Sequence, residues 1–254
     1  MSVTTTDDAL IRVDWPAPSG VQAWVTTRHG GVSAMPFDCL NLATHVGDDP
    51  SSVEENRRRL RRLAHLPAEP RWLNQVHGTE VATGDASTCL PDADASYTDA
   101  ANVVLAILTA DCLPVTFCSD DGRELAVAHA GWRGLAAGVL GATVARFSAS
   151  PESIMAWLGP AIGPQAFEVG EEVRSTFVAA NPEDAVGFVA GVRPGKYQAD
   201  LFALARLSLR RAGVQRVFGG GICTFNEAET YYSYRRDAGR TGRMATLIWR
   251  TDAD

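Results

Sequence analysis

Two histidines and one cysteine are the candidate metal ligands of this sequence. Each stands at the end of a short apolar segment with the composition of a β-strand, beside a polar or turn-forming residue; they are His77, Cys112 and His129. Neighbouring strands that end together place such side chains around one point. Two imidazoles and a thiolate make a three-ligand site with an open fourth position, a pattern typical of catalytic rather than structural zinc.

Other interpretations of the same residues stay open. Cys112 could be a buried apolar thiol, and the two histidines could be ordinary hydrogen-bonding residues at strand ends. Cys112 could also be a nucleophile with His129 as its base. That hypothesis conflicts with a metal site, because a zinc-bound thiolate is a poor nucleophile. The sequence contains neither CxxC nor HExxH, which excludes a zinc ribbon and a zincin helix.

Two arginines are the first candidates for binding an anion. Arg28 precedes Gly30 and Gly31, so a guanidinium and exposed backbone N–H groups could bind phosphate together. Arg133 lies just ahead of a predicted helix, where a helix N-terminus favours negative charge. Each has an alternative: Arg28 could lie in a plain strand-to-loop turn, and Arg133 could be a surface side chain stacked on Trp132.

Further polar residues are candidates for substrate contacts. Asn41 and His45 lie in a polar loop, and Asn41 could bond either to a substrate or within its own turn. Four late arginines stand among three tyrosines and either wall a pocket or lie in a solvated turn: Arg235, Arg236, Arg240 and Arg243.

The elements expected to position these residues are short strands interleaved with helices. Strands are predicted at 10–15, 21–27, 72–76, 103–108, 113–117, 125–128, 154–158 and 245–249. Helices are predicted from 50 to 63, after a capping acid, and at 134–147, 171–180 and 201–211. Several strands follow one another too closely for helical crossovers, which predicts a mixed sheet in an α/β (α+β) fold. No repeat or linker divides residues 1–254, so we expect one domain.

Composition narrows the class of protein. The 254 residues carry 23 basic and 30 acidic side chains, a net charge of −7, which argues against a general nucleic-acid binder. The longest uncharged apolar run is about half a membrane span, and the N-terminus lacks the basic region of a secretory signal. Five cysteines, an odd number, do not suggest a disulfide framework. We therefore expect a cytoplasmic monomer or small homo-oligomer with no nucleic-acid or membrane partner.

The candidate residues lie within longer sequence motifs. These are TRHGGVS (27–33), LNL (40–42), HVGD (45–48), NQVHG (74–78), TADCLP (109–114), HAGWRG (129–134), LGPAIG (158–163) and YRRD (234–237). Together they resemble the laccase-domain family, whose bacterial members are described as polyphenol oxidases, purine nucleoside phosphorylases or peptidoglycan editing factors. The resemblance extends from about residue 24 to residue 249.

The resemblance implies both a fold and an activity. The implied fold is a single domain with helices flanking a mixed sheet, similar to the catalytic domain of cytotoxic necrotizing factors. The implied cofactor is zinc, with copper as an alternative, bound by His77, Cys112 and His129. The implied reactions are phosphorolysis of adenosine, inosine, guanosine and methylthioadenosine, with adenosine deamination as a second activity. A Cys–His hydrolase or amidase that edits peptidoglycan precursors and a copper-dependent polyphenol oxidase are the alternatives.

The residues themselves bear on these activities. Five histidines without a His-x-His pair cannot build a multicopper cluster, so phenol oxidation would be a side activity of copper-loaded protein. Phosphorolysis requires the enzyme to hold phosphate beneath the sugar as an oxocarbenium-like transition state forms. We assign the binding of this phosphate to Arg28, with Arg133 as the second candidate. Deamination needs a carboxylic acid beside the metal. Asp111 either supplies it or, pointing away from Cys112, fixes a ligand histidine.

Overall fold

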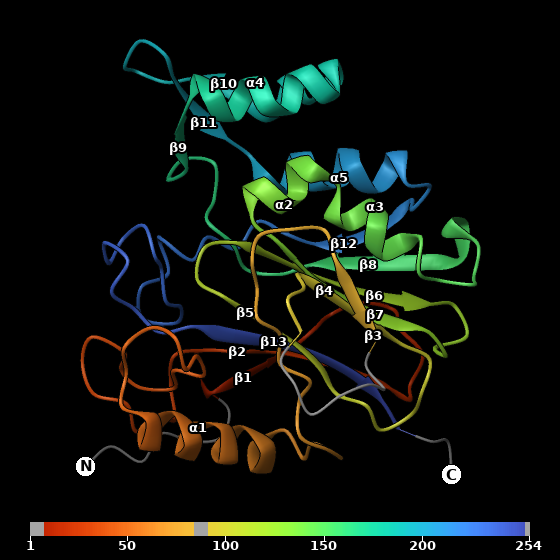
Figure 1. The fold of residues 1–254 in the computed structure, drawn as a ribbon, viewed down its shortest axis with the longest axis vertical. Coiled ribbons are helices and arrows are strands. Elements are labelled where there is room, and N and C mark those ends of the chain that lie inside the picture. Colours follow the sequence, from red (N-terminus) through yellow and green to blue (C-terminus); the bar gives the residue numbers. More distant parts are fainter. Residues whose placement is uncertain (1–7, 84–90, 252–254) are drawn as a thin grey trace.

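A six-stranded mixed sheet forms the centre of the computed structural model, which describes residues 8–83 and 91–251 (Figure 1). Its strands, in spatial order, are β12 (Arg216–Gly219), β8 (Ile154–Leu158), β6 (Leu113–Ser119), β7 (Leu125–Ala130), β4 (Ala95–Thr98) and β3 (Val81–Thr83). The four central strands pair antiparallel, whereas β12 runs parallel to β8 and β3 runs parallel to β4.

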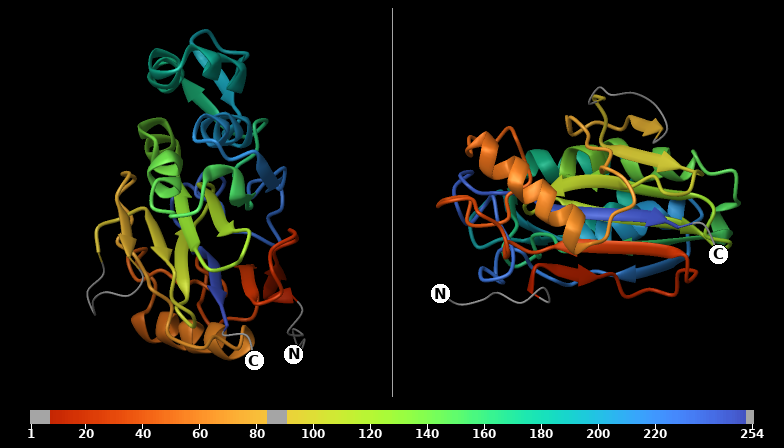
Figure 2. Two further views of the ribbon diagram at one scale, coloured as in Figure 1. Left: turned by 90° about the vertical axis from the view of Figure 1, so that its right-hand side faces the viewer. Right: turned by 90° about the horizontal axis from the view of Figure 1, so that it is seen from below.

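A second, antiparallel sheet packs against one face of the first. Its strands, in spatial order, are β1 (Leu10–Arg12), β2 (Val21–Thr26), β13 (Met244–Arg250) and β5 (Leu105–Thr109). Buried side chains such as Val25, Ile107 and Val127 fill the space between the two sheets. Helix α1 (Pro50–Leu63) crosses the outer face of this sheet (Figure 2, right). It begins where Asp49 accepts a hydrogen bond from the Ser52 backbone N–H, the arrangement that the sequence predicts.

Three helices cover the other face of the six-stranded sheet (Figure 1). They are α2 (Trp132–Ala137), α3 (Val139–Val144) and α5 (Leu201–Arg211). Leu135, Leu140 and Leu204 bury their side chains in the core that these helices form with the sheet. The short 3₁₀ helix η2 (Pro151–Ser153) leads into β8.

A small projecting unit completes the fold (Figure 2, left). It consists of the antiparallel strands β9 (Glu168–Gly170), β10 (Phe188–Ala190) and β11 (Lys196–Ala199), helix α4 (Glu171–Ala180) and the 3₁₀ helix η3 (Pro182–Gly187). Phe177 and Phe188 pack together inside it, with ring centroids 5.7 Å apart. Phe167 and Leu201 flank this unit in the chain and line the cavity described below.

The expected class of fold is confirmed, and most elements lie where the sequence places them. The predicted strand at 154–158 and the helices at 171–180 and 201–211 have the predicted bounds. The helix predicted at 134–147 is instead two helices, because Gly138 adopts φ +99°, a left-handed conformation that ends α2 and begins α3.

The strand predicted at 72–76 is wrong. This segment forms only isolated bridges, from Arg71 to Leu105 and from Asn74 to Asp92. Side chains take the place of a strand partner here: the Gln75 amide donates to Leu108 O and accepts from Leu108 N, at 2.8 and 2.7 Å. The sequence of residues 72–76 does not reveal that the Gln75 side chain, and not the segment's backbone, pairs with the backbone of β5.

Two further expectations concern cysteines and membranes. Four cysteines, Cys39, Cys112, Cys118 and Cys223, have free thiols, and Cys89 lies outside the described residues. Within residues 8–83 and 91–251, no helix combines the length and the apolar character needed to cross a bilayer.

Candidate active site

His77, Cys112 and His129 come together at one end of the six-stranded sheet. One ligand atom from each residue lies within 4.8 Å of the other two. Cys112 Sγ is 3.9 Å from His77 Nε2, and the two imidazole rings meet edge to face with centroids 4.8 Å apart. In the part of the chain that the structure describes, this is the one cluster of three or more potential His, Cys, Asp or Glu ligands. The structure thus brings together the three residues that the sequence singles out.

Local backbone geometry explains why these side chains meet. Cys112 precedes β6, and His129 lies in β7 opposite Pro114 of β6, so strand pairing brings their ends together. His77 arrives on a loop, with its backbone in the left-handed region at φ +62°. Gly131 makes the close approach feasible, because a Cβ there would lie 2.9 Å from His77 Cδ2 and 3.0 Å from Cys112 Sγ.

One buried carboxylate, Asp94, organises both histidines. Its Oδ1 accepts hydrogen bonds from His129 Nδ1 at 2.8 Å and from the His77 backbone N–H at 2.9 Å. Its Oδ2 accepts from the backbone N–H groups of Gly78 and Val76, at 2.6 and 3.1 Å. With Nδ1 held in this way, His129 offers Nε2 as the ligand nitrogen, as histidines at metal centres commonly do.

Of the two roles that the sequence leaves open for Asp111, the structure does not show the one in which it fixes a ligand histidine. Asp94 does so from a position 35 residues before His129, where no local pattern marks it. Asp111 instead bonds to residues far along the chain that hold no ligand position. The signal that could have identified Asp94 is weak: it is a fully buried acid just before a short strand, and burial is not visible in the sequence.

Replacing Asp94 with asparagine is expected to weaken metal binding about 10- to 100-fold, the usual effect of losing a carboxylate behind a ligand histidine. The amide retains one acceptor oxygen for the four N–H donors that Asp94 serves. Competition with a metal chelator measures the change. Asp92→Asn is the matched control, because within the described residues the Asp92 side chain bonds to the exposed Asn74 side chain and to neither histidine. Equal metal affinity in both variants would contradict the positioning role of Asp94.

The charges of the three residues depend on one another. Burial opposes ionisation of the Cys112 thiol, but the nearby His129 and His77 outweigh it and lower the pKa of Cys112 to about 6. Burial also disfavours the charged form of His129, yet Cys112 and Asp94 raise the pKa of His129 to about 9. Between these values the metal-free protein carries a thiolate beside an imidazolium. A metal ion must displace the His129 proton to bind there.

A cavity of about 430 Å³ opens beside the three residues. This volume suits a small-molecule ligand. Its apolar walls include Trp132, Ile162, Phe167, Leu201 and Tyr234, and its polar lining includes His45, Gln75, Arg133, Arg235 and Arg243. Burial, followed by the charges of Arg243 and Arg57, lowers the pKa of His45, so this imidazole is neutral at pH 7.

The three arginines of the cavity share one environment. Each guanidinium stacks on an aromatic ring of the cavity wall: Arg133 on Trp132 at 4.4 Å, Arg235 on Phe167 at 5.4 Å and Arg243 on Tyr234 at 5.6 Å. Main-chain carbonyls orient two of them, since Arg235 donates to Glu168 O and Arg243 to Thr241 O and Gly242 O. None of the three lies within 4 Å of a carboxylate oxygen in the described residues. Their positive charges are therefore available to an anionic ligand.

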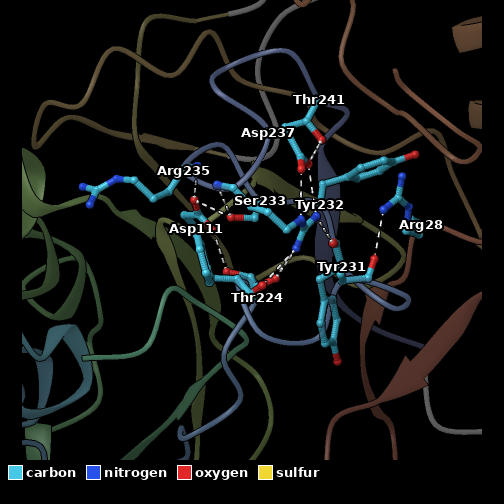
Figure 3. Close-up of polar contacts among 12 residues, drawn as sticks. Arg28, Asp111, Thr224, Tyr231, Tyr232, Ser233, Arg235, Asp237 and Thr241 are labelled. Atoms are coloured by element: carbon cyan, nitrogen blue, oxygen red, sulfur yellow. Dashed lines mark hydrogen bonds and ion pairs between the residues drawn. The ribbon is translucent and has the colours of Figure 1, made fainter. Parts of the chain in front are cut away.

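Arg28 does not reach this cavity, contrary to its predicted role. Its guanidinium donates to Asp38 O, Asp38 Oδ2 and Ala228 O at 2.9–3.1 Å, and it lies over the ring of Tyr232. Figure 3 shows Arg28 and Arg235 on opposite sides of the polar network. The local sequence indicates a guanidinium beside glycines, but the two carbonyls and the carboxylate that bind it come from other segments.

Asn41 is also absent from the cavity lining. It is fully buried, and its amide bonds within its own turn to Ala43 and to Asp48, the alternative that the sequence left open. Its Oδ1 also accepts from the Arg243 backbone N–H at 3.0 Å, so it supports a cavity residue without contacting the cavity.

The remaining predicted residues divide between cavity and scaffold. His45 and Arg133 line the cavity as predicted candidates, and of the late arginines only Arg235 and Arg243 do so. Arg236 binds Asp237 and main-chain carbonyls instead. Sequence reasoning missed the apolar wall residues Phe167 and Leu201, because they lie about 35 to 125 residues from the three clustered ligands and carry no motif of their own.

Nearly the whole sequence is similar to known proteins. A family model described as multi-copper polyphenol oxidoreductase laccase matches residues 22–251. Purine nucleoside phosphorylase PA4543 of Pseudomonas aeruginosa is 54% identical over 96% of this chain and 100% of its own. Purine nucleoside phosphorylase YfiH of Escherichia coli is 53% identical over 94% of this chain and 98% of its own.

Solved structures share the fold. The crystal structure of Neisseria meningitidis protein NMB0706 matches with a TM-score of 0.91 and 50% identity, covering 96% of this chain and 99% of its own. That of YlmD from Geobacillus stearothermophilus matches with a TM-score of 0.90 and 36% identity, covering 96% of this chain and 97% of its own.

Proposed function

This chain belongs to the multi-copper polyphenol oxidoreductase laccase family, and we propose that within it the protein is a zinc-dependent purine nucleoside phosphorylase. The observation that carries the proposal is the cavity, where a His–Cys–His cluster and three arginines without carboxylate partners surround one space. A purine nucleoside and a phosphate ion are the two ligands that such a lining would accept. The proposed nucleosides are adenosine, inosine, guanosine and methylthioadenosine, with adenosine deamination as a second activity.

The donor set supports zinc as the metal. Two imidazole nitrogens and one thiolate leave an open coordination position, and His129 has the carboxylate partner that ligand histidines ordinarily have. His77, Cys112 and His129 would hold the ion, which when bound supplies positive charge and Lewis acidity to the cavity. The free thiol of Cys112 agrees with a reducing, cytoplasmic location.

The chain's own residues would handle phosphate and nucleoside. Arg235 and Arg243, held by stacking and by main-chain carbonyls, are preorganised to bind phosphate, and Arg133 adds a third positive charge. The aromatic walls would pack against the purine. As the bond from the sugar to the purine breaks, the phosphate charge stabilises the oxocarbenium-like sugar. This assigns to Arg235 and Arg243 the role that the sequence suggested for Arg28.

The histidine content makes polyphenol oxidation at most a side activity of copper-loaded protein. A multicopper oxidase needs several imidazoles in addition to a His₂Cys copper. Beyond His77 and His129, His45 is the one further histidine that lines the cavity.

A second candidate function is a Cys–His hydrolase or amidase acting on a peptidoglycan precursor. The pKa of Cys112, lowered to about 6 by His129 and His77 despite burial, favours it, because a thiolate at neutral pH is nucleophilic. Bound zinc would block this chemistry. Activity measured with and without metal therefore distinguishes the two functions. A hydrolase would be most active after the metal is removed by chelation, whereas the phosphorylase would lose its activity.

Product analysis with inosine tests the proposed function. Zinc-loaded protein is expected to release hypoxanthine and ribose 1-phosphate only when phosphate is supplied. Release of free ribose without phosphate would identify a hydrolase instead. No turnover of any of the four nucleosides, with or without phosphate, would refute the proposal.

A further inference from the structure

Asp111 lines the cavity and lies at the centre of a buried polar network (Figure 3). Its Oδ1 accepts a hydrogen bond from Thr224 Oγ1 at 2.6 Å. Its Oδ2 accepts from Ser233 Oγ at 3.0 Å and from the Arg235 backbone N–H at 2.7 Å. Its backbone is fixed as well, because Asp111 O accepts from Ile162 N at 2.9 Å. All three donors to the carboxylate come from a segment more than 100 residues later in the chain.

The position of Asp111 in the chain gives this network a consequence for the cavity. It directly precedes Cys112, and its backbone adopts φ +86°, which turns the chain between β5 and β6. One residue therefore joins the thiol ligand to the segment that carries Tyr234 and Arg235. The Arg235 side chain is held separately, through its bond to Glu168 O. The Asp111 carboxylate therefore holds the backbone of Arg235, and the Glu168 carbonyl holds its guanidinium.

We propose that Asp111 is a positioning residue that holds Arg235 at a fixed place relative to Cys112. The arginine that binds the anion and the residues that bind the metal then face the same part of the cavity. Asp111 acts by accepting hydrogen bonds and takes no proton in the reaction. Its carboxylate oxygens are occupied by Thr224, Ser233 and Arg235, and only 7% of the residue is exposed. The inference rests on the proposed function in one respect, the binding of phosphate by Arg235.

Two substitutions separate the hydrogen bonds from the charge. Asp111→Gly removes the carboxylate and keeps the left-handed backbone, which glycine adopts freely. Asp111→Asn also tolerates this backbone. Its amide oxygen can accept from Arg235 N and Ser233 Oγ while its NH₂ donates to the Thr224 hydroxyl. Asn therefore preserves positioning but abolishes any role as an acid or base.

The first readout is the binding of inorganic phosphate alone to zinc-loaded protein. This binding is measured by the rise of Tm with phosphate concentration. Asp111→Gly is expected to weaken phosphate binding about 10- to 100-fold, the effect of losing a charge-assisted contact. Asp111→Asn should remain within about threefold of the unsubstituted protein, since both bonds to the loop can re-form. Zinc content should stay at one per chain in both variants, because the Asp111 carboxylate bonds to none of the three ligands.

Thr224→Val is the matched control for a purely structural role. It removes the bond to Oδ1 and leaves both bonds to Ser233 and Arg235. It should lower Tm without changing phosphate affinity. Phosphate binding weakened equally by Thr224→Val and Asp111→Gly would overturn the positioning role. So would an Asp111→Asn protein as defective as Asp111→Gly, because it would show that the charge is required.

Hydrogen exchange at the Arg235 amide distinguishes this inference from the proposed function. The amide donates to Asp111 Oδ2, so its exchange should accelerate in Asp111→Gly and stay slow in Asp111→Asn. If the unsubstituted protein binds no phosphate, the proposed function fails, and the exchange rates still decide whether Asp111 anchors Arg235. Unchanged exchange in Asp111→Gly would overturn the inference whatever the activity.

Discussion

Replacing Cys112 with serine is expected to abolish tight zinc binding and, with it, both phosphorolysis and deamination. A hydroxyl is a far weaker zinc ligand than a thiolate, and the pKa of Cys112, lowered to about 6 by its histidine neighbours against the effect of burial, makes the thiolate available at neutral pH. The loss should exceed the 10- to 100-fold effect typical of a residue behind the ligands. Elemental analysis of protein purified without added metal, expected to give one zinc per unsubstituted chain, measures it.

Stability gives an independent measurement of the same change. A ligand present at 100 times its dissociation constant stabilises a folded protein by about 2.7 kcal/mol, so added zinc should raise the Tm of the unsubstituted protein and not that of Cys112→Ser. Cys39→Ser is a suitable control, because Cys39 lies outside the ligand cluster and the cavity lining. Full zinc occupancy in Cys112→Ser would show that the metal assignment is wrong.

Arg235→Ala and Arg243→Ala are each expected to raise the phosphate concentration needed for phosphorolysis about 10- to 100-fold. A charge-assisted contact is worth roughly 1.5–3 kcal/mol. Among the residues that the structure describes, neither guanidinium has a carboxylate within 4 Å to which its charge is already committed. Deamination should be largely spared, because its nucleophile is water and not phosphate. The KM for phosphate and the rate of inosine formation from adenosine are the two quantities to compare.

Arg28→Ala serves as the contrasting variant. It removes hydrogen bonds to Asp38 and Ala228 and a contact with the Tyr232 ring, so it should lower the free energy of unfolding by about 1–3 kcal/mol. The phosphate requirement of the folded enzyme should not change. A large rise in the phosphate KM of Arg28→Ala, with none in Arg235→Ala, would show that Arg28 and not Arg235 binds phosphate. Equal loss of both activities in zinc-loaded Arg235→Ala would remove its phosphate role.

Local sequence was sufficient for α1, α4 and α5 and for the strands β1, β2, β5 to β8 and β13, but it predicted none of β3, β4 and β9 to β12. The Asp49 cap and the following proline predict the start of α1, and apolar periodicity predicts α4 and α5, because these signals act within a few residues. The break at Gly138 was less evident, since glycine is compatible with a continuing helix until its φ is known.

The candidate ligands could also be chosen from the sequence, for a physical reason. Cys112 and His129 stand at facing ends of β6 and β7, and paired strands bring such ends together whatever the rest of the fold does. His77 required more, because its segment is not a strand; its position depends on Asp94 and Gln75.

The residues around the ligands were decided by tertiary structure alone. Arg28 and Arg235 look alike in the sequence, each a guanidinium in a loop, and differ only in the partners that the fold supplies. Asp38 and Ala228 bind Arg28, and the Asp38 carboxylate offsets its charge, whereas Arg235 meets a carbonyl and a ring that leave its charge available. The same holds for Asp94, whose partners lie 16 to 35 residues away. Residue type and local spacing determine what chemistry a side chain can perform, but hydrogen-bond partners distant in the chain determine where it points and whether its charge is free.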